Sequence, residues 1–210
     1  MKPTSICISF FAAIILLSSC NKRQQQNQTG FPASVLDYRY ENGRLEGLFA
    51  QADSLKYAQL YPEAIDAFLA LSADPSLSKE DGYYLHNQLA DLYLLRYKLD
   101  SAQQHISVLR EEMSALQPDA SLGAQADYWL NKGRLAFRLR HPKEALDALQ
   151  RALDLYEAVY PDKIHLKKAL THTFLGLCHF SFEKDNLPFY RHVETAYDIV
   201  RADSLLWPYS

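Results

Sequence analysis

Small and apolar residues recur at helical spacing along most of this chain of 210 residues. Four segments each carry a small residue in a helix-like stretch, and these residues are Ala52, Ala90, Gly133 and Gly176. In the first three segments a second small residue follows after twelve positions, a large one four positions later, and an apolar or small one three further on. The three sets are Ala64, Phe68 and Leu71; Ala102, Ile106 and Leu109; and Ala145, Leu149 and Ala152. Offsets of four and seven keep one face of an α-helix toward its neighbours, so the pattern predicts paired helices.

Proline and glycine usage agrees with this pattern. Pro62, Pro142 and Pro188 stand where a second helix is expected to begin, and proline fits the first turn of a helix. Seven glycines and nine prolines are too few for an all-β domain of many short strands. We therefore predict an all-α fold of about four helix pairs over residues 34–204. The fourth pair departs from the register, because Pro188-Phe189 stands where the second small residue should be.

The third segment is the most diagnostic of the four. It reads Trp129-x2-Lys132-Gly133-x2-Ala136, followed by the second-helix set of Ala145 and by Pro161. This pattern resembles a tetratricopeptide repeat, whose period is about 34 residues. The small residues here are 38 and 43 apart, which resembles the longer-helix variants of kinesin-light-chain-like arrays. The resemblance implies an α-α superhelix, a solenoid of antiparallel helix pairs whose concave face binds a protein or peptide.

The N-terminus has the pattern of an export signal. Lys2 precedes the apolar run of residues 6–17, which is shorter than the roughly 20 residues of a membrane-spanning helix. Leu17-Ser18-Ser19-Cys20 follows, and it resembles the lipobox of bacterial lipoproteins. The resemblance implies a signal peptide over residues 1–19 and lipidation of Cys20, although an ordinary signal peptide with an incidental cysteine is the alternative. The polar residues after Cys20 predict a flexible tether over residues 20–33.

The predicted location is the cell envelope, with the protein lipid-anchored to a bacterial membrane. In Bacteroidetes-like lipoproteins an acidic stretch after the acylated cysteine marks export to the cell surface. Lys22 and Arg23 stand there instead, so we expect an outer-membrane anchor that faces the periplasm. Removal of Cys7 with the signal and acylation of Cys20 would leave Cys178 as the single free thiol, in an apolar helix where burial is expected.

Charge and motifs argue against several classes of function. A formal net charge of -3 gives no long-range attraction for nucleic acid. The sequence has no HExxH, CxxC, phosphate-binding loop or nucleophile elbow, so we expect no enzyme, no cofactor and no small-molecule substrate. His165, His172 and His179 share one helical stripe, but heptad neighbours are about 10 Å apart along the helix axis. A metal site is therefore not predicted.

The repeat register predicts which residues face the concave surface. They are the acidic residues Asp53, Asp91 and Asp127, the amide Asn87, the apolar and aromatic residues Phe49, Tyr84, Leu130 and Phe137, and the cations Arg134 and Arg138. Arg134 and Arg138 are one turn apart and are predicted to grip a carboxylate, with Leu130 and Phe137 as apolar anchors. The alternative is that these residues form only a solvated face.

The function favoured by the sequence is a membrane-anchored scaffold that binds a protein or peptide partner in the envelope. The alternative is a periplasmic sensory or regulatory module of a signalling system, or the front part of a longer regulator. The apolar tail over residues 205–210 fits three hypotheses: it folds back over the last helix pair, it continues into a longer architecture, or it docks on a partner.

Overall fold

The structure is a computed structural model, and it describes residues 43–113, 122–161 and 165–202. These residues are helical, and no strand occurs among them. The elements are α2 (Gly43–Tyr57), α3 (Tyr61–Ser72), α4 (Lys79–Leu95), α5 (Leu99–Met113), α6 (Leu122–Arg138), α7 (Pro142–Val159), α8 (Leu166–Cys178), the π-helical turn η1 (His179–Glu183) and α9 (Asn186–Ala202). The prediction of an all-α fold is confirmed.

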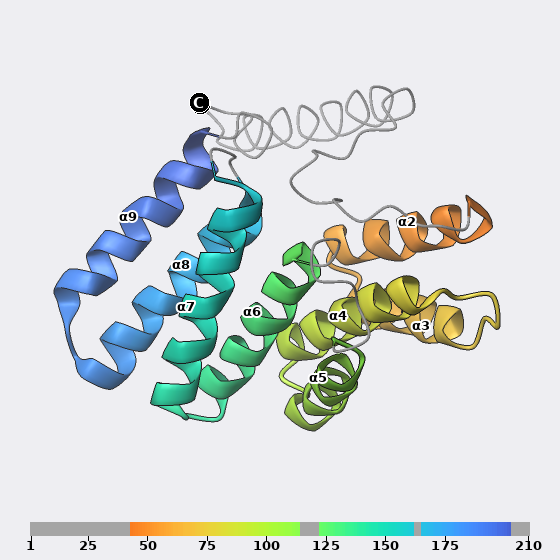
Figure 1. Cartoon of the computed structure of the whole chain (residues 1–210), viewed down its shortest axis with the longest axis horizontal. Helices are drawn as coiled ribbons and strands as arrows, with labels where there is room; N and C mark the ends of the chain where they lie inside the picture. Colours follow the sequence, from red (N-terminus) through yellow and green to blue (C-terminus); the bar gives the residue numbers. More distant parts are fainter. Residues whose placement is uncertain (1–42, 114–121, 162–164, 203–210) are drawn as a thin grey trace, which may run out of the picture. The chain divides into compact units, whose positions relative to one another are not determined.

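The helices pack as neighbours in chain order (Figure 1). The most extensive contacts join α2 to α3, α4 to α5, α6 to α7, and α8 to α9. Each pair also contacts the next one, because α3 packs on α4, α5 on α6, and α7 on α8. The first helices α4, α6 and α8 contact one another in succession as well. Successive pairs are therefore joined in two ways. The second helix of one pair packs on the first helix of the next, and the first helices α4, α6 and α8 also contact one another.

The residues that define the sequence register lie where a first helix meets its second helix. Ala52 and Ala90 are fully buried, and so are the second-helix residues Ala64, Ala102 and Ala145. The large residues of the same register are also in the core, namely Phe68, Ile106 and Leu149. Gly133 has the closest approach, since a Cβ atom there would lie 2.6 Å from Leu149 Cγ. Small residues allow this close approach, and the large ones fill the adjacent space.

The turns inside the first three pairs have one common geometry. Gln59, Tyr97 and Arg140 adopt the left-handed conformation, with φ of 61°, 56° and 60°. In the first turn, the Gln59 amide donates to the Lys56 carbonyl and the Leu60 amide to the Leu55 carbonyl, both at 3.0 Å. The other two turns repeat these bonds at the equivalent residues. This is the Schellman helix end, and it reverses the chain so that the second helix starts at the same point in each pair.

The fourth pair reverses the chain differently. Its left-handed residue is Lys184, which follows Gly176 by eight positions, whereas Arg140 follows Gly133 by seven. The extra residue is accommodated by η1, where the Lys184 amide donates to the His179 carbonyl in a π-helical bond. Phe189 then takes the place of the second small residue, and a Cβ atom on Gly176 would lie 3.3 Å from the Phe189 carbonyl oxygen. Glycine in the first helix thus makes room where the second helix carries a large residue.

Several predicted segments lie outside the described residues. They are the signal peptide over residues 1–19, the lipidation site Cys20, the tether over residues 20–33 and the tail over residues 205–210. Among the residues that are described, no helix is both long and apolar enough to cross a membrane.

Gly133→Ala is expected to destabilise the fold by about 1–3 kcal/mol, because the added methyl group would overlap Leu149. The matched control is Gly82→Ala in α4, where a Cβ atom would meet nothing within 4 Å. Alanine favours a helix interior over glycine, so the control should gain up to about 1 kcal/mol. Urea unfolding followed by circular dichroism measures both. Equal midpoints for the two variants would show that the crossing at Gly133 is not tightly packed.

Candidate partner-binding surfaces

Three charged side chains form a ladder across the first helices of three successive pairs. Lys56 Nζ in α2 lies 2.5 Å from Asp91 Oδ2 in α4. The other oxygen of Asp91 accepts a hydrogen bond from Arg134 Nη1 in α6. All three side chains are mostly buried, and the Arg134 side chain is only 5% exposed. A negative charge between two positive ones is therefore the main electrostatic link between α2, α4 and α6.

The titration of Asp91 shows the balance of forces in this ladder. Burial alone would raise the pKa of its carboxyl group, because a charge in a low-dielectric site is poorly solvated. The positive charges of Lys56 and Arg134, together with their hydrogen bonds, outweigh burial and hold the pKa of Asp91 well below its usual range. Asp91 is thus charged at neutral pH and satisfied by the chain itself.

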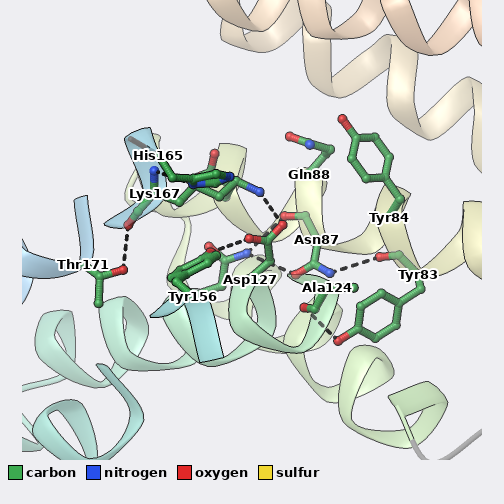
Figure 2. Close-up of polar contacts among 12 residues, drawn as sticks. Tyr83, Tyr84, Asn87, Gln88, Ala124, Asp127, Tyr156, His165, Lys167 and Thr171 are labelled. Carbon is green, nitrogen blue, oxygen red and sulfur yellow. Dashed lines mark hydrogen bonds and ion pairs between the residues drawn. The ribbon is translucent and has the colours of Figure 1, made fainter. Parts of the chain in front are cut away.

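An amide ladder runs beside the charges. Asn131 Nδ2 donates to the Asn87 carbonyl oxygen at 3.2 Å, and Asn131 Oδ1 accepts from Arg134 Nη1 at the same distance. Asn87 Nδ2 donates in turn to the Tyr83 carbonyl oxygen at 3.4 Å, as Figure 2 shows. The Tyr83 hydroxyl then donates to the Ala124 carbonyl oxygen at 3.3 Å. These bonds fix α4 against α6 with buried polar groups that have partners.

Asp127 forms a second charged contact, this one between the third and fourth pairs. Its carboxylate accepts hydrogen bonds from the Tyr156 hydroxyl and from Lys167 Nζ (Figure 2). Burial and the Asp127 charge both raise the pKa of Tyr156 well above its usual value. Tyr156 therefore remains protonated and acts as a hydrogen-bond donor. Asp127, like Asp91, is occupied by partners within the chain.

Two of the predicted contact residues lie in the core instead. Phe49 is fully buried, with its ring centroid 6.3 Å from that of Phe68 and 5.8 Å from that of Tyr84. Leu130 is buried in the cluster that joins α6, α7 and α8. A partner could reach either residue only if the helices separated. The assignment of Phe49 and Leu130 to an accessible face is therefore corrected: they hold the helices together.

Asp53 and Tyr84 belong to the same packed region. The Tyr84 hydroxyl donates to Asp53 Oδ2 at 2.9 Å, and both side chains are buried. The pair links α2 to α4, with Asp53 one turn before Lys56 and Tyr84 two turns before Asp91. Asn87 is buried as well. These three predicted contact residues consequently act between helices.

The two arginines predicted to grip one carboxylate have separate partners. Arg134 is paired with Asp91, and its guanidinium lies 5.4 Å from the centroid of the Phe174 ring. Arg138 lies 4.0 Å from the centroid of Tyr97 and also donates to the Tyr97 hydroxyl. Phe137 packs edge-on against Phe174. The structure thus brings the predicted residues together, but each guanidinium group contacts another residue of the chain. The prediction that Arg134 and Arg138 grip one carboxylate together is therefore corrected.

A groove that was not predicted lies between α5, α6 and α7; we call it the outer groove. Two adjoining hollows of about 210 Å³ and 540 Å³ form it, and Lys132, His141 and Glu144 line both. The first is also lined by Gln103, Ile106, Ser107, Arg110, Tyr128, Leu135, Ala136 and Leu139. The second is also lined by Trp129, Pro142, Lys143, Asp147, Ala148 and Arg151. The sequence offered one signal, Trp129, which was part of the repeat motif of the third segment.

Histidines pair across two of the helix pairs. His86 Nδ1 lies 2.9 Å from His105 Nδ1, and His172 Nδ1 lies 2.9 Å from His192 Nδ1. The two contacts are equivalent in the register, since His86 and His172 each stand four residues before the small residue of their first helix. A contact this short requires one ring nitrogen to donate and the other to accept. Burial lowers the pKa of all four histidines, which favours neutral rings in both contacts.

The stripe of His165, His172 and His179 forms no common site. His165 accepts from the Lys167 amide and stacks on Tyr160, while His179 contacts Glu183. Within the described parts of the chain, no group of three or more histidine, cysteine or acidic side chains is arranged to hold a metal ion. Cys178 is buried as expected, and burial raises the pKa of its thiol to about 12.

Comparison with known proteins identifies a shared fold. No known family and no curated protein matches this sequence. Among solved structures, the chain is similar to the crystal structure of BtubC (BKLC) from P. vanneervenii, with a TM-score of 0.55 and 17% sequence identity. The match covers 84% of this chain and 68% of that one. At this identity the likeness concerns the helical fold alone.

Asp91→Asn is expected to cost about 3 kcal/mol of unfolding free energy, because it leaves the buried Arg134 guanidinium without its counter-charge. The matched control is Glu144→Gln, which removes the carboxylate 3.5 Å from Lys132 at a more exposed site. Exposed ion pairs contribute less than about 1 kcal/mol. Chemical denaturation measures both changes. If Asp91→Asn were as mild as the control, the charge ladder would not hold α4 against α6.

The histidine pairs predict a pH dependence of stability. Burial, and secondarily the neighbouring imidazoles, lower the pKa of His105 and of His192 to about 4. An unfolded chain binds these protons near pH 6.5, so stability should be complete above that pH and should fall progressively between pH 6.5 and 4. The urea midpoint of the variant His105→Gln/His192→Gln should change less with pH over this window than that of the wild type. His141→Gln, at an exposed histidine, should keep the wild-type slope, and a slope unchanged in both would refute the assignment.

Proposed function

We propose that this protein is a membrane-anchored scaffold of tetratricopeptide type that binds a protein or peptide partner in a bacterial cell envelope. The observation that carries the proposal is the repetition of one supersecondary unit. Three successive helix pairs have a small residue at the crossing and a residue of left-handed conformation at the same position of the turn. Stacked helix pairs of this kind expose long surfaces, and their usual activity is recognition of another chain.

The interior of the repeat array supports binding over chemistry as the main activity. The polar groups of Asp91, Arg134, Asn131 and Asp127 are held by bonds within the chain. Groups committed in this way stiffen the contacts between successive pairs, because each pair is held to the next by buried charge and amide bonds. A stiff array loses less conformational entropy when it binds a partner.

The anchor part of the proposal comes from Leu17-Ser18-Ser19-Cys20 and the apolar run before it. A lipid chain on Cys20 would hold the helices near one leaflet. The predicted tether would span roughly 20 Å as a coil. The helical domain would then meet partners that are embedded in, or pass along, the same membrane.

The scaffold and the anchor are both tested in cells that express the protein with a photo-crosslinking amino acid in place of Lys143. This residue lies at the edge of the outer groove. The wild type should sediment with membranes and Cys20→Ser should not, while the control Cys178→Ser should sediment like the wild type. Irradiation should join the protein to one discrete partner. The same probe in place of Asp66, exposed on α3, should not yield that product. Membrane retention of Cys20→Ser would remove the anchor, and identical products from both probe positions would remove a specific partner site.

A further inference from the structure

The charge ladder between the first helices and the outer groove differ in whether their cations have carboxylate partners. In the ladder between first helices, each cation has a carboxylate partner in the chain. Arg110 and Arg151 line the outer groove, and neither has a carboxylate partner among the residues that the structure describes. We propose that the outer groove between α5, α6 and α7 binds an acidic peptide segment, with an aliphatic side chain on its floor and carboxylates at Arg110 and Arg151. This inference rests on the proposed scaffold function and names the chemistry of its partner.

The floor of the groove is apolar and rigid. Ile106, Tyr128 and Leu135 line it and are each only 2–3% exposed. They belong to the core cluster that joins α4, α5 and α6, so their positions are fixed by the packing of three helices. A hollow of about 210 Å³ above such a floor accepts an aliphatic side chain such as leucine.

The rim of the groove is cationic. Arg110, Lys132, Lys143 and Arg151 line the two hollows, against the two carboxylates of Glu144 and Asp147. Arg151 lies 4.3 Å and Lys132 Nζ 5.0 Å from the centroid of the Trp129 ring, so the indole holds two cations beside one hollow. Lys132 also contacts Glu144 at 3.5 Å, but the two side chains are 30% and 49% exposed and the contact is weak. Excess positive charge around an apolar floor is complementary to an acidic segment with an aliphatic residue.

Tyr128 provides a polar group directed at the same ligand. Its side chain is buried apart from the groove that it lines, and no hydrogen bond to its hydroxyl occurs within the described part of the chain. Burial raises the pKa of Tyr128, whereas the Arg110 and Arg151 charges lower it. Tyr128 and Arg110 line the same hollow. A carboxylate held at Arg110 could accept a hydrogen bond from the protonated hydroxyl.

Polyanions such as RNA are a worse fit than a peptide. The carboxylates of Glu144 and Asp147 lie within the rim and would repel a continuous row of phosphates. An acidic peptide carries its charges at separated positions, so it can place carboxylates at the two arginines and leave uncharged backbone beside Glu144. Competition between the two kinds of ligand consequently distinguishes them.

The experiment uses the full chain in detergent micelles and a fluorescein-labelled eight-residue peptide of glutamate, leucine and glycine. Fluorescence anisotropy should show saturable binding that weakens with salt. Arg110→Glu/Arg151→Glu should raise Kd at least about tenfold, because two charge-assisted contacts become repulsive. Tyr128→Phe should raise Kd about threefold, as expected for one lost hydrogen bond.

The matched control is Arg191→Glu/Arg201→Glu, which makes the same change in net charge at two exposed arginines of α9. Its Kd should stay within about twofold of the wild type, and circular dichroism should show that every variant folds. Equal loss in both double variants would show non-specific attraction, and no binding of the acidic peptide would refute the inference. Stronger competition by single-stranded RNA than by unlabelled peptide would assign the groove to nucleic acid instead. Any of these outcomes together with a discrete crosslink at Lys143 would leave the scaffold proposal standing and overturn only the ligand chemistry.

Discussion

The close approach of a first helix to its second helix is the constraint on which the rest of the structure depends. At Gly133 there is no room for even one additional methyl group beside Leu149. Such an approach admits only small and apolar residues at the crossing itself, so the polar contacts within a pair, such as that of His86 with His105, lie away from it. Other polar side chains of the first helices face the neighbouring pairs, among them Asp91 and Arg134.

The charge ladder results from the placement of polar side chains between neighbouring pairs. Lys56, Asp91 and Arg134 are on three successive first helices and are removed from water by the stacking of the pairs. A buried charge without a partner would cost several kcal/mol, so the stack tolerates them only in alternating sign. They hold the second pair against both of its neighbours, because each neighbour places a cation beside the carboxylate of Asp91. Asp91 and Arg134, which were predicted to face a partner, contact the adjacent pairs.

The sequence predicted the helices and their register. It also predicted that a group of polar residues lies on one shared face of the first helices. Period and residue size suffice for that, because the small residues must lie at the crossings. It did not predict that Phe49 is in the core or that Arg134 is paired. Helical periodicity states which face a residue occupies, but not whether that face is open or covered by the next pair. The π-helical turn at η1 was also missed, since one added residue before Phe189 does not disturb the apolar pattern on either side.

At one register position the third pair differs from the second and fourth pairs. The first-helix residue four before the crossing meets the second-helix residue three after its small position. In the second and fourth pairs both are histidines, and their rings contact each other at 2.9 Å. In the third pair they are Trp129 and Ala148, and both line the larger hollow. Alanine leaves open a space that an imidazole fills in the other two pairs, so the indole and its two cations remain accessible from outside. A difference of residue size within this repeated contact thus leaves a hollow at the third pair where the second and fourth pairs are packed.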